Sequence, residues 1–116
     1  MKNCLFCKII NKEVPSDIIY EDEKVIAFKD IHPLAPVHVL IIPKKHLASI
    51  IDIKKEDIEL VGKLIFVAKN IADEFKLSKD GYKLLFRVGS HGGQVVEHIH
   101  LHLIGGVRLS EDIHPI

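Results

Sequence analysis

Hydrophobic positions recur with two different periods along the chain. Between Glu56 and Phe75 apolar residues return every three or four positions, and most of the charged residues fall between them. This spacing predicts one amphipathic helix of about five turns. Elsewhere the apolar residues come in short runs rich in branched side chains, and such runs predict strands. Two periods in one chain indicate that helix and sheet share a single core.

The short apolar runs and the turn residues between them predict an α+β fold. A short helix is expected over residues 5–11, and Asp52 is the expected cap of the long helix. Because the strands follow one another closely, most of the sheet should be antiparallel, with the long helix on one face. Sheet edges left open favour a homodimer. The expected strands are Ile18–Glu21, Val25–Lys29, Val37–Pro43, Tyr82–Val88 and Val96–Ile104.

Length and charge narrow the class of protein. The 116 residues suit one domain, residues 1–116, and 47% of them are hydrophobic, as in globular proteins. The formal net charge is zero, so nothing favours nucleic acid or an anionic membrane as a partner. No apolar stretch approaches the roughly 20 residues of a membrane span, and the N-terminus lacks the apolar region of a signal peptide. We therefore expect a cytoplasmic location.

Three histidines alternate with apolar residues near the C-terminus: His98, His100 and His102. In a strand they would share one face, while the residues between them would face the core. One interpretation is a three-histidine metal site with an open position for water. The other is a nucleophilic imidazole assisted by its neighbours. Residues four apart on a strand are separated by about 13 Å, which favours the second interpretation without excluding the first.

A glycine-rich loop, residues 89–94, precedes the histidines. Its glycines allow backbone amides to turn inward as a phosphate cradle, and Gln94 can donate to a phosphate oxygen. Ser90 in the same loop is a further candidate for nucleotide binding.

Cys4 and Cys7 form a C-x-x-C pair, the chain's only cysteines. A thioredoxin-like redox pair requires a preceding strand, and none is predicted here. A metal site requires two more ligands than the pair supplies, and the eight histidines of the chain offer candidates.

Four segments together resemble the histidine triad (HIT) family, in its Hint branch. They are residues 92–106 (GGQVVEHIHLHLIGG), 4–10 (CLFCKII), 27–38 (AFKDIHPLAPVH) and 42–46 (IPKKH). The resemblance implies an α+β homodimer in which two five-stranded antiparallel sheets join into one. It also implies hydrolysis of a nucleotide at the α-phosphate, above all cleavage of the P–N bond of adenosine 5′-phosphoramidates. Alternatives are a dinucleoside polyphosphate hydrolase and a zinc-stabilised nucleotide-binding protein with little turnover.

The resemblance also assigns roles to residues. His100 matches the nucleophile, His102 and Gln94 the phosphate contacts, His38 the residue that orients the nucleophile, and Asp30 the carboxylate that binds the ribose. The apolar slot for a purine base is matched by Leu5, Phe6, Ile9, Phe28 and Ile31, although ordinary core packing explains Leu5 and Ile9 equally well.

Structural zinc is the one cofactor that the resemblance implies, with no organic cofactor. Its ligands would be Cys4, Cys7, His46 and His98. Arg87 departs from the family, which usually has asparagine there near the phosphate and leaving group. The charge of an arginine favours substrates with extra phosphates if its side chain points into the site, and has no such effect if it points outward. The histidines that match no family position, His32, His91 and His114, are expected on the surface.

Overall fold

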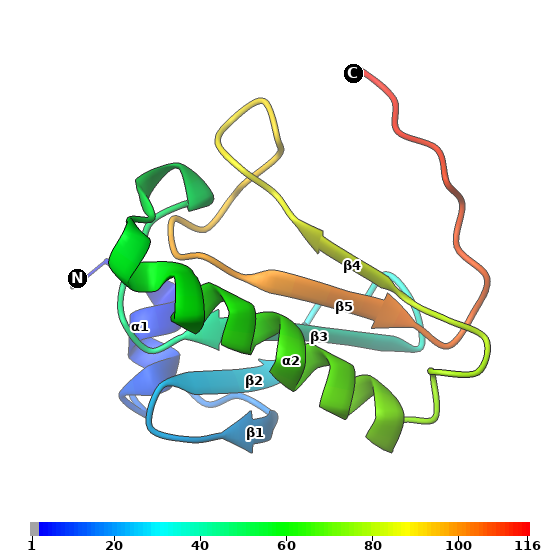
Figure 1. The fold of residues 1–116 in the computed structure, drawn as a ribbon, viewed down its shortest axis with the longest axis horizontal. Helices are drawn as coiled ribbons and strands as arrows, with labels where there is room; N and C mark the ends of the chain where they lie inside the picture. The colour runs from blue at the N-terminus through cyan, green and yellow to red at the C-terminus, as the bar shows by residue number, and fades with distance from the viewer. Residues whose placement is uncertain (1–2) are drawn as a thin grey trace.

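A five-stranded antiparallel sheet forms the centre of the fold, with strand order β1-β2-β3-β5-β4. The computed structural model describes residues 3–116, so Met1 and Lys2 lie outside it. One long and one short helix accompany the sheet, which confirms the expected fold class (Figure 1). The elements are α1 (Leu5–Ile10), β1 (Ile18–Glu21), β2 (Val25–Lys29), β3 (Val37–Pro43), α2 (Ile58–Glu74), β4 (Lys83–Phe86) and β5 (Leu101–Gly105).

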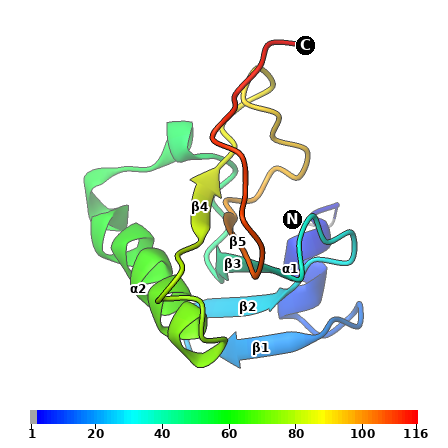
Figure 2. The ribbon, with the colours of Figure 1, turned by 90° about the vertical axis from the view of Figure 1, so that its right-hand side faces the viewer.

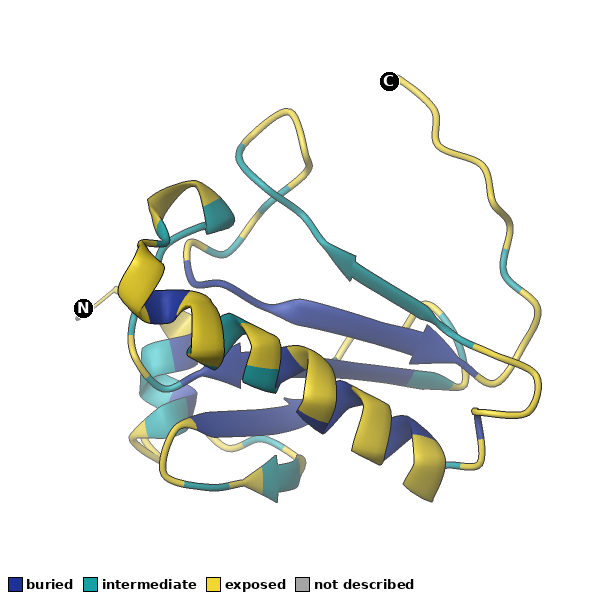
Figure 3. Cartoon of the chain, in the orientation of Figure 1, coloured by how far each residue is buried: buried dark blue, intermediate teal, exposed yellow. Residues whose placement is uncertain are grey.

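The long helix α2 covers one face of the sheet. Its inward side is apolar and buried, and its charged residues face outward (Figure 3). This is the arrangement that the three-to-four residue period dictates. The helix ends at Glu74 with Phe75 as its C-cap, and Lys76 then takes the left-handed conformation with φ 59°, so that Leu77 N–H can donate to Ala72 O. The core on this face comprises Val25, Ala27, Val39, Ile41, Leu47, Leu64, Val67, Ala68, Ile71, Ala72, Leu77, Ile99, Leu101 and Leu103.

The short helix α1 lies on the opposite face of the sheet (Figure 2). Cys4 caps it, because its Sγ accepts a hydrogen bond from Cys7 N–H. Phe6 and Ile9 are the buried residues of α1, and they pack against Ile26, Phe28, Leu40 and Ile42 of β2 and β3. Because α1 has only six residues, it covers only part of this face.

The last strand is shorter than expected. β5 spans Leu101–Gly105 rather than Val96–Ile104, and residues 96–100 form no strand. Ile99 N–H donates instead to Leu47 O, in a segment that no strand pattern marks. The alternation of faces nevertheless holds, since Ile99 lies in the core beneath α2 while His98 and His100 point to the other side. β4 is also shorter than expected, Lys83–Phe86 instead of Tyr82–Val88.

The expected cap of the long helix is wrong. Asp52 ends a 3-10 turn (Ile50–Asp52), and a second turn (Lys55–Asp57) leads into α2. Asp57 occupies the capping position, but its carboxylate accepts hydrogen bonds from Lys54 N–H and Lys45 Nζ instead of from the helix. The carboxylate is thereby paired, as a residue only 2% exposed requires.

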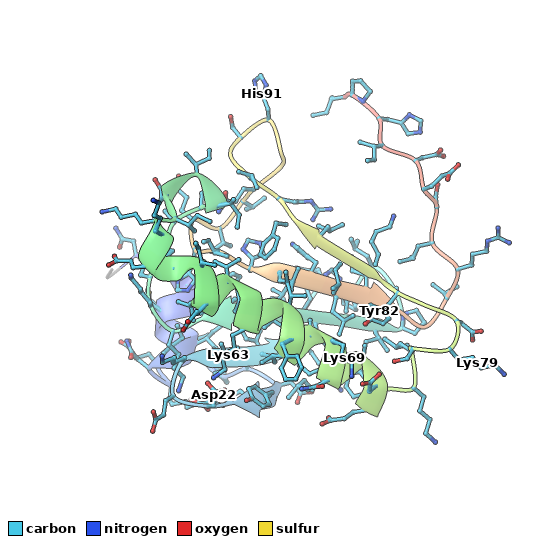
Figure 4. All side chains as sticks on the ribbon, in the orientation of Figure 1. Asp22, Lys63, Lys69, Lys79, Tyr82 and His91 are labelled. Carbon is cyan, nitrogen blue, oxygen red and sulfur yellow. The ribbon has the colours of Figure 1, made fainter. Side chains whose placement is uncertain are left out.

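Asp22 joins the β1–β2 turn to the long helix. Lys63 of α2 lies 2.7 Å from the Asp22 carboxylate, and the two side chains face each other in Figure 4. The same carboxylate accepts hydrogen bonds from Lys24 N–H and Val25 N–H, so it also fixes the turn.

None of the helices in the described part of the chain is long and apolar enough to cross a membrane.

Candidate functional site

A cavity of about 520 Å³ opens beside α1, on the face of the sheet opposite α2. This volume is typical of small-molecule sites. The lining has an apolar part, which includes Leu5, Phe6, Ile9, Val14 and Phe28. It also has a polar part, made of Asp30, His38, Arg87, His100 and His102, and the two parts meet where Phe6 packs against His100. A ligand with an aromatic base at one end and a phosphate at the other fits this division.

The direction of the hydrogen bond between His38 and His102 follows from the backbone amide of Leu34. Leu34 N–H donates to His38 Nδ1 at 3.1 Å, so the proton of this imidazole lies on Nε2. His38 Nε2 in turn lies 2.9 Å from His102 Nδ1 and donates to it. The proton of neutral His102 is therefore on Nε2. That buried atom has no partner within residues 3–116 and belongs to a side chain that lines the cavity, so it is a free donor.

His100 has the opposite tautomer. Its Nδ1 lies 2.7 Å from His98 O, and because a carbonyl only accepts, the proton is on Nδ1. The Nε2 lone pair is then free to act as a nucleophile. The edge of the ring packs against Phe6, with centroids 5.1 Å apart and the planes at 84°. One histidine thus offers a lone pair, and His102 beside it offers a hydrogen-bond donor.

Burial keeps these imidazoles neutral. Desolvation is the main cause that lowers the pKa of His102 to about 4, and the charges of His100 and Arg87 lower it further. The pKa values of His38 and His100 are also lowered, first by burial. Asp30 lies 3.4 Å from His38 Nε2 and opposes this effect, but burial outweighs it. At neutral pH His100 therefore keeps its lone pair.

A second cluster of four side chains includes the first histidine of the triad. Its members are Cys4, Cys7, His46 and His98. Their donor atoms lie within 4.8 Å of one another. His46 Nδ1 and His98 Nδ1 are 3.1 Å apart, and Cys7 Sγ lies 3.3 Å from His46 Nδ1 and 3.6 Å from His98 Nδ1. Ligands around tetrahedral zinc are separated by about 3.3–3.8 Å, so the donor set fits such an ion.

The protonation of the cluster also suits a cation. His98 Nε2 donates to Pro43 O at 2.7 Å, which leaves the Nδ1 lone pair toward the other ligands. Burial and the neighbouring Cys4 raise the pKa of the Cys7 thiol to about 11. A bound cation would supply the charge that holds both thiols as thiolates.

Most of the predicted binding residues line the cavity, but two do not. Asp30, Leu5, Phe6, Ile9, Phe28, Ile31 and Arg87 all line it. Ser90 is exposed in the glycine-rich loop and does not contribute to its lining. Gln94 is also absent from the lining. Its amide donates to Ala48 O and Val96 O and accepts from Gly89 N–H, so it anchors the loop.

The glycine-rich loop is held together by its own backbone. The amides of Gly92 and Gln94 donate to Gly89 O, and that of Gly93 donates to Ser90 O. These three amides are therefore not directed at a phosphate, and the expectation that they form a phosphate cradle is wrong. A Cβ on Gly92 would lie 2.3 Å from Val88 O, so only glycine fits this tight turn. His91 projects from the tip of the loop, and His32 and His114 are also exposed (Figure 4).

Sequence reasoning missed two backbone groups that set the histidine tautomers. They are Leu34 N–H, which donates to His38, and Pro43 O, which accepts from His98. The prolines on either side of Leu34 were the one available signal, since they indicate a tight loop just before His38.

A five-stranded antiparallel sheet with alternate buried histidines at its cavity defines a histidine triad fold. A family model described as "Scavenger mRNA decapping enzyme C-term binding" matches residues 3–111. The chain belongs to the histidine triad family and is a HIT-family hydrolase.

Individual relatives agree with this assignment. The purine nucleoside phosphoramidase of Escherichia coli K12 is 47% identical over 102 residues, covering 88% of this chain and 86% of the relative. The 14 kDa zinc-binding protein of Zea mays is 47% identical over 108 residues, covering 91% of this chain and 84% of the relative. The crystal structure of a HIT family hydrolase from Legionella pneumophila Philadelphia 1 is 50% identical with a TM-score of 0.92, covering 94% of this chain and 97% of that one.

Proposed function

We propose that this protein hydrolyses phosphoramidates of purine nucleoside 5′-monophosphates through a nucleotide transiently attached to His100. The observation that carries the proposal is the pair of opposite tautomers in one cavity. His100 Nε2 carries a lone pair, and His102 Nε2 carries a proton without a partner among the residues described. The name of the Escherichia coli relative supports the substrate class.

In the first step the His100 Nε2 lone pair forms a bond to the α-phosphorus, and the P–N bond of the substrate breaks. Its electron pair remains on the leaving nitrogen, which takes a proton from solvent and departs as an amine, while the neutral His102 keeps its Nε2 proton and donates a hydrogen bond to a phosphate oxygen. In the second step water attacks phosphorus and releases its proton to solvent, while the P–N bond to His100 breaks. His38 holds His102 in the required tautomer throughout both steps. The products are an amine and a nucleoside monophosphate.

The nucleotide lies with its base at the apolar part of the cavity and its ribose at Asp30. Phe6 and Phe28 pack edge to face, with centroids 5.4 Å apart, and form one wall for the base. Leu5 and Ile31 are 44% and 80% exposed, so both have surface left to cover a ligand, and Ile9 extends the wall inward. Phosphate contact falls to His102. Gln94 positions the loop, and it reaches phosphate only if its amide leaves its present hydrogen bonds. No role is assigned to the exposed Ser90.

We also propose that Cys4, Cys7, His46 and His98 bind one structural zinc ion. The donor distances, the His98 tautomer and the name of the Zea mays relative support this. When bound, zinc would cross-link α1 to the segment that carries the triad and thereby stiffen one wall of the cavity.

We further propose a cytoplasmic homodimer in which β4, one of the two edge strands, extends the sheet into a second copy. The exposed apolar residues Ile58, Ile65 and Phe66 on α2 support an interface near this helix. Sedimentation of the purified protein at twice the chain mass of 13.1 kDa tests the dimer.

Hydrolysis of adenosine 5′-phosphoramidate tests the central proposal. The wild type should release ammonia and AMP, and intact mass after rapid quenching should show a nucleotidyl group on the protein. A His100→Ala variant should lose both signals, whereas His91→Ala, at the exposed loop tip, should keep them. Unchanged turnover in His100→Ala, or no turnover in the wild type, would overturn the mechanism.

A further inference from the structure

Arg87 lines the cavity together with His38, His100 and His102. It directly follows β4, whose antiparallel register pairs Leu85 with His102 of β5. Continuing that register by two residues places Arg87 opposite His100 on the same face. Arg87, His100 and His102 all line the cavity. The Arg87 side chain passes close to Gly93, since a Cβ added to Gly93 would lie 3.5 Å from Arg87 Cδ, in ordinary van der Waals contact. Both residues line the cavity.

The guanidinium has no partner in the part of the chain that the structure describes. No carboxylate lies within 4.0 Å of it, and none of its donors makes a hydrogen bond there. By contrast, Lys45 and Lys63 each pair with an aspartate. Arg87 acts on the site as an uncompensated positive charge, since it lowers the pKa values of His38, His100 and His102. Such a charge beside a cavity attracts an anion.

The order of the strands shows which part of a substrate would meet Arg87. Asp30 follows β2, His102 lies on β5, and Arg87 follows β4, at the far edge of the sheet. A nucleotide with its ribose at Asp30 and its α-phosphate at the β5 histidines extends toward β4. What lies beyond the α-phosphate in that direction is the leaving group.

We propose that Arg87 binds an anion carried by the leaving group, a carboxylate or a further phosphate, and thereby makes the protein prefer nucleotides with anionic leaving groups. This inference rests on the proposed function, because it presupposes a nucleotide bound at the triad. Arg87 exchanges no proton in the reaction. The P–N bond breaks and the amine takes its proton from solvent as before, while the guanidinium holds the anion through charge-assisted hydrogen bonds.

Three AMP phosphoramidates test the preference, with glycine, glycinamide or aminomethylphosphonate as the leaving amine. Glycine and glycinamide are close in size and differ in charge, and the phosphonate distinguishes phosphate-like from carboxylate anions. The wild type should favour the anionic amines over glycinamide in kcat/KM by roughly 10- to 100-fold, the range expected for a hydrogen bond to a charged group. Arg87→Asn should abolish the preference, and Arg87→Lys should retain part of it.

Two outcomes would overturn the inference. One is a wild type that treats glycine and glycinamide alike. The other is an Arg87→Asn variant that loses the same factor on all three substrates, which would mean that Arg87 acts on the α-phosphate or on the fold.

A binding measurement separates failure of this inference from failure of the proposed function. In the His100→Ala background, which cannot form the intermediate, ADP should bind roughly 10-fold or more tightly than AMP because its β-phosphate reaches Arg87. Adding Arg87→Asn should make the two affinities equal. If the wild type hydrolyses no phosphoramidate but this difference is present, the proposed function fails while Arg87 keeps its role. If hydrolysis occurs and the difference is absent, the inference about Arg87 fails alone.

Discussion

His38 Nε2 lies 2.9 Å from His102 Nδ1, and the hydrogen bond runs from His38 to His102. Its direction is fixed from outside the pair, because Leu34 N–H already occupies His38 Nδ1. A single backbone amide, Leu34 N–H, therefore determines that the proton of His102 lies on Nε2. His38 acts as a positioning residue for His102.

Replacing His38 should slow the chemical step more than it weakens binding. In His38→Phe the His102 imidazole can change tautomer, and its Nε2 then loses the hydrogen that it donates to the phosphate in the transition state. We expect kcat to fall by roughly 100-fold, with a much smaller change in KM. His91→Phe, at an exposed loop tip, is the control. A variant in which KM alone changes would contradict the positioning role.

The burial of His102 should make folding stability depend on pH. Its pKa is about 4 in the fold, against about 6.5 in an unfolded chain. Above pH 6.5 both states are neutral at this residue, and stability is complete. As the pH falls from 6.5 to 4, only the unfolded state takes up the proton, so roughly 3 kcal/mol of stability should be lost.

Urea unfolding between pH 7.5 and 4 measures this effect. The variant His102→Asn carries no titrating group at the position and should lose less stability over the same range. Any contribution of metal loss is common to both proteins and cancels in the comparison. If the free energy of unfolding changes equally with pH in the two proteins, His102 is not kept neutral by the fold.

The sequence predicted the face of the sheet on which each triad residue lies more accurately than it predicted the bounds of the last strand. Alternation of His98 and Ile99 indicated opposite faces, and the structure keeps them there although residues 96–100 form no ladder. The reason is that burial of alternate apolar residues fixes the faces locally. Ladder pairing depends on a neighbouring strand, and the partner of Ile99 is Leu47 O, far away in sequence.

The hydrogen-bond partners of the polar side chains could not be predicted from the sequence. Gln94 is well suited to donate to phosphate, and nothing local indicates that its amide is held by Ala48 and Gly89. Likewise, the tautomers of His38 and His98 depend on backbone groups that only folding brings near. Residue types and spacing identified the candidates, but the roles that the structure supports follow from contacts between distant segments.

Gly92 should be intolerant of any side chain. An alanine Cβ would lie 2.3 Å from Val88 O and 2.7 Å from Val88 N, both backbone atoms that cannot rotate away. The loop would have to open, and the hydrogen bonds of Gln94 would be lost with it. We expect Gly92→Ala to lower the free energy of unfolding by about 1–3 kcal/mol, together with activity. Ser90→Ala, exposed in the same loop, should change stability by less than about 0.5 kcal/mol. Equal stability of the two variants would show that the turn is not tight.

Metal removal should loosen α1 and leave the long helix in place. Purified without chelators, the protein should contain about one zinc per chain, because its four donors form a closed set. His46→Asn should lose the metal and lower the melting temperature by about 5–10 °C, the shift expected for one to two kcal/mol in a domain of this size. The effect of zinc itself is measured by comparing His46→Asn with chelator-treated wild type, and the two should have the same melting temperature. His91→Asn should keep both the metal and the wild-type melting temperature. A wild type with no bound zinc, or one whose melting temperature is unaffected by a chelator that removes its zinc, would exclude a structural role for the ion.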